Sequence, residues 1–166
     1  WIILIVVILI IAWIISVYNG LISSRQKVEN AWSQIDVQLQ RRFDLIPNFV
    51  ETVKGYAAHE SETFEKITSL RTSWANANTV AEKADLDNQL SGALKTIMAV
   101  SENYPDLKAN QNFSELSEEL RNTENKISFS RQFYNDTVLT YNNLREQFPS
   151  NIIANMFKFG KIDFFK

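Results

Sequence analysis

A long run of uncharged residues opens the chain and constrains what it can fold into. Residues 1–22 contain no charged side chain, and the first charge is on Arg25. A helix of about 20 mostly apolar residues crosses a bilayer core of about 30 Å. Trp13 and Tyr18 lie toward the C-terminal end of the run, and such amphipathic rings favour the headgroup boundary. The run therefore predicts a membrane-spanning helix.

Two alternatives fit this run less well. A core helix of a soluble protein carries polar residues on one face, whereas this run is apolar on all sides. A signal peptide ends in a cleavage site of small residues, and residues 16–20 (Ser-Val-Tyr-Asn-Gly) form a poor one. We therefore expect a retained span. Because the sequence does not begin with methionine, we also expect residues upstream of Trp1.

The composition of the whole chain excludes several classes of protein. The net charge of −2 provides no basic surface for nucleic acid, so we expect no nucleic-acid partner. The absence of cysteine excludes disulfides, thiolate catalysis and cysteine-bound metal centres. Only four glycines and three prolines interrupt 166 residues, which favours long helices.

Apolar residues at helical spacing predict an all-α fold, in which the transmembrane helix continues into an elongated antiparallel four-helix bundle. The segments 79–82 (Thr-Val-Ala-Glu) and 112–115 (Asn-Phe-Ser-Glu) have the form that caps a helix start. The expected organisation is a span at 1–22, a bundle at 23–148 and an aromatic-rich C-terminal tail at 149–166. The expected bundle helices are residues 23–43, 45–76, 80–103 and 113–147.

The boundary between the first two bundle helices lies in residues 41–47. Arg41 and Arg42 suit a helix C-terminus, and Asp44 suits an N-cap. Pro47 disfavours helical geometry at the residue before it. We expect a turn that reverses the chain here. The alternative is a continuous helix that is kinked at this point.

Catalytic chemistry has few candidate residues in this chain. His59 is the only histidine, and a zinc-protease motif would require a second one at Thr63. A di-iron bundle requires histidines on two helices, and the chain has no glycine-rich phosphate loop. We expect no catalytic residue, no cofactor and no metal site, and therefore no enzyme.

Charged and polar residues gather around the expected first turn. One interpretation is a patch that binds a partner protein. The alternative is surface polarity together with hydrogen bonds that fix helix register. The candidate patch consists of Asp36, Arg41, Arg42, Asp44, Asn48 and Glu51.

The tail after Pro149 is rich in phenylalanine and lysine. Such a segment can lie on a bilayer surface or against a neighbouring subunit. Equally, it can fold back and cover the open end of the bundle. The candidate contact residues are Phe157, Phe159, Phe164 and Phe165.

The order of several segments resembles the bacterial LemA family. They are Tyr18-Asn19-Gly20-Leu21, Ala31-Trp32-Ser33-Gln34-Ile35-Asp36, Asp44-Leu45-Ile46-Pro47-Asn48, Tyr104-Pro105-Asp106-Leu107, Tyr134-Asn135 and Phe148-Pro149-Ser150-Asn151. The resemblance implies a single-pass bacterial membrane protein with a four-helix-bundle domain. Family members have been connected with membrane proteases and with signalling, and the family's molecular role is unsettled. Residues 161–166 end earlier than family tails usually do.

These observations lead to two hypotheses of function. The first is a membrane-anchored, non-enzymatic structural protein that self-assembles into a homo-oligomer in contact with membrane lipid. The alternative is an adaptor or regulator of a membrane-bound protease or signalling protein. We expect the bacterial inner membrane as the location. Arg25, Lys27, Arg41 and Arg42 favour a cytoplasmic bundle by the positive-inside tendency, but lysines upstream of Trp1 would reverse it, so the side stays open.

Overall fold

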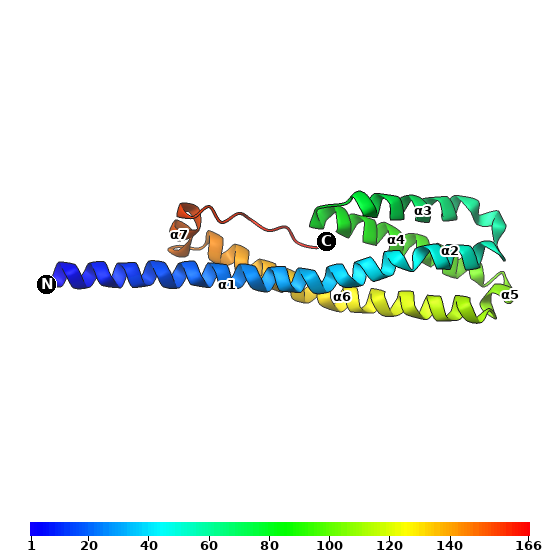
Figure 1. Cartoon of the computed structure of the whole chain (residues 1–166), viewed down its shortest axis with the longest axis horizontal. Coiled ribbons are helices and arrows are strands. Elements are labelled where there is room, and N and C mark those ends of the chain that lie inside the picture. The colour runs from blue at the N-terminus through cyan, green and yellow to red at the C-terminus, as the bar shows by residue number, and fades with distance from the viewer. The chain divides into compact units, whose positions relative to one another are not determined.

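The structure, a computed structural model, describes residues 1–166 and contains helices but no strands. The predicted all-α class is confirmed, and an apolar helix stands at the N-terminus. The number of helices in a bundle stays a prediction. The elements are α1 (Ile2–Asp44), α2 (Ile46–Lys54), the 3-10 helix η1 (Ala58–Glu60), α3 (Ser61–Asn76), α4 (Val80–Ser101), α5 (Pro105–Lys108), α6 (Gln111–Glu146) and α7 (Ser150–Met156) (Figure 1).

The chain divides into two compact units. Unit 1 contains Trp1–Ser33 and Gln132–Phe164, and unit 2 contains Gln34–Arg131 and Phe165–Lys166. The boundary between the units divides α1 after Ser33 and α6 after Arg131, so each of these helices has one part in each unit. The predicted end of the span at residue 22 and the predicted start of the tail at residue 149 stay predictions.

The N-terminal part of α1, in unit 1, is apolar and uncovered. None of its most apolar 18-residue window is buried inside the structure. A core helix would have the opposite property. By length and composition, this helix can cross a membrane.

The core of unit 1 forms where α1 packs beside the C-terminal part of α6. Leu21 and Val28 of α1 and Val138 of α6 are buried there. The rings of Trp32 and Tyr134 lie 5.7 Å apart between centroids. Apolar residues at helical spacing in α1 are thus buried inside unit 1.

The tail folds back in unit 1 because side chains of α6 bind its main chain. The Asn142 amide donates to the carbonyl of Ile162 at 2.9 Å and accepts from the N–H of the same residue at 3.1 Å. Three further donors reach other carbonyls of the tail: Tyr134 to Asp163 at 3.1 Å, Tyr141 to Gly160 at 2.8 Å and Arg145 to Phe159 at 2.8 Å.

The two tyrosines remain proton donors under ordinary conditions. Burial, with a smaller effect of the Asp163 charge, raises the pKa of the Tyr134 hydroxyl to about 12. Burial also raises the pKa of the Tyr141 hydroxyl, against the opposing charges of Arg25 and Arg145. Both hydroxyls therefore keep the proton that the tail carbonyls accept.

The predicted chain reversal at residues 41–47 is wrong, and the alternative of a continuing helix describes this region. Leu45 alone separates α1 from α2, and its φ of −75° and ψ of −18° are helical. Its N–H donates to Arg41 O at 3.2 Å, and its carbonyl accepts from Phe49 N–H at 3.0 Å. Pro47 lies in the first turn of α2, a position at which proline is well tolerated.

The chain of unit 2 reverses at residues 55–60 instead. The predicted helix at 45–76 is therefore divided into α2, η1 and α3. Ile46, Phe49 and Val53 of α2 are buried, so α2 continues the apolar face of α1. Burial of that face explains why the helix continues through the proline.

Two predicted helix starts have different outcomes. The Thr79 hydroxyl accepts from Glu82 N–H at 3.1 Å, as the sequence pattern predicts for the start of α4. Helix α6 begins at Gln111, and the side chain that caps it is Asn110, which accepts from Phe113 N–H at 3.0 Å. The predicted start at 113 is thus two residues late.

The hold of Asn142 on the tail predicts a protease-sensitive variant. We expect Asn142→Ala to lose two hydrogen bonds of about 1 kcal/mol each, which raises the fraction of detached tail at least about tenfold. Trypsin should then cleave after Lys158 and Lys161 faster than in the parent chain, as followed by mass spectrometry. Asn143→Ala, at the exposed neighbouring position, is the matched control and should leave the cleavage rate unchanged.

Candidate functional site

The six residues of the predicted patch lie in unit 2, but the structure does not bring them together as one surface. Arg42 is fully buried, while Arg41, Asp44, Asn48 and Glu51 are exposed. The patch therefore divides into a buried ion pair, a set of surface pairs and the wall of a groove.

The buried ion pair joins Arg42 of α1 to Asp87 of α4. Arg42 has 0% of its surface exposed, and its Nη1 donates to Asp87 Oδ1 at 2.5 Å. Its Nη2 donates to Ser91 Oγ at 3.0 Å and lies 3.8 Å from the carboxylate of Glu124. One guanidinium thus contacts side chains of two other helices, α4 and α6.

Burial disfavours the charged form of Asp87. Desolvation raises the pKa of the Asp87 carboxyl above its usual value, although Arg42 acts in the opposite direction. Buried ion pairs are weak sources of stability, but removing one partner leaves a costly unpaired charge. These contacts are made in one alignment of α1 against α4. This supports the register interpretation for Arg42.

Sequence reasoning missed both α4 partners of Arg42. Asp87 and Ser91 lie four residues apart on the buried side of α4, among buried apolar residues such as Leu90 and Leu94. Two polar residues at i and i+4 among apolar residues at helical spacing were the available signal. A single sequence does not say which buried cation such a pair would meet.

The other charges around α1 pair at the surface of unit 2. Lys83 Nζ donates to Asp36 Oδ1 at 2.8 Å and lies 4.9 Å from the centroid of the Trp74 ring. Arg41 forms an ion pair with Glu119 of α6. Asp44 accepts from Gln40 Nε2 at 2.9 Å. Most charges of the predicted patch are thus engaged within the chain.

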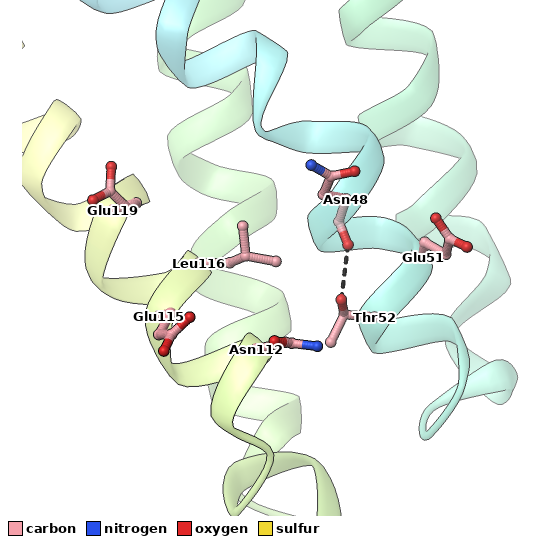
Figure 2. Close-up of a pocket in the computed structure, with 7 residues that line it drawn as sticks. All are labelled: Asn48, Glu51, Thr52, Asn112, Glu115, Leu116 and Glu119. Carbon is pink, nitrogen blue, oxygen red and sulfur yellow. Dashed lines mark hydrogen bonds between the residues drawn. The ribbon is translucent and has the colours of Figure 1, made fainter.

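The last two patch residues line an acidic groove between α2 and the start of α6 (Figure 2). Its volume is about 550 Å³. The Thr52 hydroxyl donates to the Asn48 carbonyl at 2.9 Å, so Thr52 is held on its own helix. The groove is lined by Asn48, Glu51, Thr52, Asn112, Glu115, Leu116 and Glu119. Glu119 is paired with Arg41, and the remaining carboxylates of Glu51 and Glu115 favour a cationic partner over an anionic one.

A second groove lies in unit 1, between α1 and the C-terminal part of α6. It has a volume of about 600 Å³ and mostly apolar walls. The α1 wall consists of Gly20, Ser23, Ser24 and Lys27, and the α6 wall of Phe133, Asp136, Thr137, Thr140 and Leu144. A Cβ added at Gly20 would meet no atom within 4 Å, so this wall is open. Small residues thus face bulkier ones across an uncovered groove.

Opposite charges stand on the two walls of this groove. Lys27 and Asp136 are both exposed, and they form no ion pair with each other. Phe133 is 56% exposed. Sequence reasoning did not select these residues, because each belongs to a polar stretch of its own helix and only the fold brings the two helices together.

The four tail phenylalanines have different surroundings. Phe159 and Phe165 are buried, as the fold-back alternative expects. In unit 1, the guanidinium carbon of Arg25 lies 5.1 Å from the centroid of the Phe159 ring. In unit 2, the guanidinium carbon of Arg131 lies 5.0 Å from the centroid of the Phe165 ring. Phe157 is half exposed and Phe164 partly exposed, so an outside contact through these two stays a prediction.

The histidine and the carboxylates form no metal-binding cluster in the structure. His59 is exposed in η1. No group of three or more histidine, aspartate or glutamate side chains is arranged to hold a metal ion.

Comparison with known proteins finds one family and several relatives. The model of the LemA family matches residues 31–166. Protein LemA of Metamycoplasma hominis is 27% identical over 137 residues, 82% of this chain and 63% of that protein. Magnetosome protein MamQ 2 of Paramagnetospirillum magneticum is 25% identical over 186 residues, 96% of this chain and 68% of that protein. The chain thus spans about two thirds of the length of these relatives.

The buried ion pair predicts a distinctive mutational pattern. We expect Asp87→Asn to lower the free energy of unfolding by about 3–5 kcal/mol, because it leaves the buried Arg42 charge without its main partner. The double variant Arg42→Met/Asp87→Leu should recover most of this loss, since apolar residues of similar volume replace both charges. Denaturant unfolding of the full chain in detergent, followed by circular dichroism, measures both.

The control for this comparison is Asp85→Asn, at an exposed position on the same helix. Asp85 accepts only from Gln89 one turn away, at 2.7 Å. Its loss should cost no more than about 0.5 kcal/mol. Equal effects at positions 85 and 87 would contradict a special role for the buried pair.

Proposed function

The chain belongs to the LemA family, and on this premise we propose that it is a membrane-anchored, non-enzymatic structural protein that self-assembles into a homo-oligomer at the bacterial inner membrane. The relatives support a membrane-associated protein. The uncovered apolar part of α1 supports an anchor in contact with lipid. The observation that carries self-assembly is the open groove of unit 1.

Copies anchored in one membrane share the same orientation, which restricts how two grooves can meet. A two-fold axis along the membrane normal places the α1 wall of one copy opposite the α6 wall of the other at the same height. Lys27 then faces the partner's Asp136, and the same pair occurs a second time across the axis. The small residues of each α1 wall receive the bulkier residues of the opposite α6 wall. The groove is complementary to itself in both charge and size.

The groove also stands in the right part of unit 1 for assembly in a membrane. Gly20 lies within the uncharged run, and Ser23, Ser24 and Lys27 follow directly after it. Contacts made here would join neighbouring copies where their spans leave the bilayer. This supports lateral association of anchored copies.

Charge reversal tests this interface. We expect the parent chain in mild detergent to have the mass of an oligomer by light scattering. Lys27→Glu places like charges across the proposed contact and should shift the population to smaller species. Lys27→Glu/Asp136→Lys should restore the larger mass, because the opposite charges are again paired. The matched control is Lys126→Glu, at an exposed position outside the groove.

The outcomes separate the function from the interface. A parent chain that remains monomeric over a wide concentration range would overturn self-assembly. An oligomer that is insensitive to Lys27→Glu would leave self-assembly standing and place the contact elsewhere.

The acidic groove of unit 2 favours a second candidate, an adaptor or regulator of a membrane-bound protease or signalling protein. Glu51 and Glu115 are exposed on its opposite walls and have no cationic partner within the chain. Such a groove fits a basic segment of another protein. Arg41 and Arg42 are poor test sites for a partner, since both are paired internally.

The adaptor hypothesis makes its own prediction about co-purification. Glu51→Lys/Glu115→Lys should release a bound basic partner, because it reverses the charge of the groove while the helices keep their buried faces. Affinity purification followed by mass spectrometry measures the loss. Retention of every co-purifying protein by the double variant would count against the adaptor.

A further inference from the structure

Apolar side chains are exposed around α7, at the point where unit 1 turns from α6 into the tail. The exposed fractions are 80% for Phe148, 48% for Ile152, 59% for Met156 and 49% for Phe157. Ile152 and Met156 lie four residues apart and therefore share one face of the helix. Clusters of exposed apolar residues mark surfaces that contact another apolar phase.

The inner face of α7 is already used by the chain. Ile153 and Ala154 are 1% and 0% exposed, so they pack inside unit 1. A helix of seven residues that is apolar toward the chain and also toward the outside requires a second apolar environment. The chain does not provide one for the outer face.

The contacts of Phe157 fix the height of α7 along α1. Its ring packs edge-on against Tyr18, with 4.8 Å between the centroids. Tyr18 lies within the uncharged run of residues 1–22, and the first charge follows at Arg25, about 10 Å further along the helix at ~1.5 Å per residue. Figure 1 shows α7 beside this part of α1. Helix α7 is thus level with the end of the span.

The charges around α7 suit a headgroup layer. Lys158 and Lys161 follow the helix and are exposed, and Arg25 lies over the Phe159 ring. Cations beside apolar residues favour the boundary of an anionic membrane. No acidic residue occurs between Phe148 and Asp163. The exposed apolar residues at α7 are thus followed directly by exposed basic residues in the tail.

We propose that α7 is an interfacial helix and that its outer face, formed by Phe148, Ile152, Met156 and Phe157, lies in the headgroup and upper acyl region of the bilayer that α1 crosses. The lipid surface is the occupant because this face is level with, and beside, the lipid-facing side of the span. The proposal rests on the membrane anchor of the proposed function but not on self-assembly. It gives the chain a second contact with the membrane beside its span.

Site-directed spin labelling tests the position of α7. The chain contains no cysteine, so Ile152→Cys and Met156→Cys each provide one labelling site in the full chain. The labelled protein is placed in vesicles of phosphatidylcholine and phosphatidylglycerol. Collisions with oxygen report the apolar phase, and collisions with a water-soluble nickel chelate report water. Leu9→Cys in the span and Lys126→Cys at an exposed polar position provide the two reference values.

We expect the oxygen-to-nickel accessibility ratio at positions 152 and 156 to rise several-fold above that at 126, toward the value at 9. A ratio equal to that at 126 would overturn the proposal by placing α7 in water. Protection from both reagents would also overturn it, because protein would then cover the face. The helical signal in circular dichroism verifies that each variant is folded. Particle mass, measured on the same samples, reports self-assembly independently.

Discussion

The uncharged run at the start of α1 is the constraint on which the interpretation of unit 1 depends. None of its most apolar 18-residue window is buried in the structure, so these side chains need an apolar environment outside the chain, as a bilayer would supply. This requirement sets a height for every neighbouring feature. The uncharged run ends between Tyr18 and Arg25, and α7 and the groove of unit 1 both lie near that end. The uncovered surfaces of unit 1 therefore lie near the end of the apolar run, the part of the chain on which both proposals depend.

Unit 2 depends on a different kind of contact. The buried Arg42 guanidinium contacts Asp87, Ser91 and Glu124, and apolar residues often replace such buried ion pairs without loss of stability. Helices with repeated apolar seams can slide by one turn with little change in burial. A buried charge pair permits one alignment and penalises the others. Such a pair contributes little to stability but favours a single register of the helices.

The sequence predicted the elements that depend on local patterns. The apolar run, the helical class and the Thr79 cap are local, and the structure contains them. The reversal at residues 41–47 failed because Pro47 suits a turn and the first turn of a helix equally well. Asp87 was missed because its role depends on a cation 45 positions earlier. The hold of α6 on the tail was not predictable, since the groups that it binds are main-chain atoms common to every sequence.

The hydrogen bonds from α6 to the main chain of the tail have a consequence for how the tail can evolve. Asn142, Tyr134, Tyr141 and Arg145 bind carbonyl and N–H groups, which do not change when a side chain is replaced. The exposed positions Gly160, Lys161 and Asp163 can therefore diverge while the tail keeps its course. Selection could alter the charge of this surface to suit a new lipid or a new neighbour without redesigning the fold. The side chains of the tail can change while its main chain stays bound to α6.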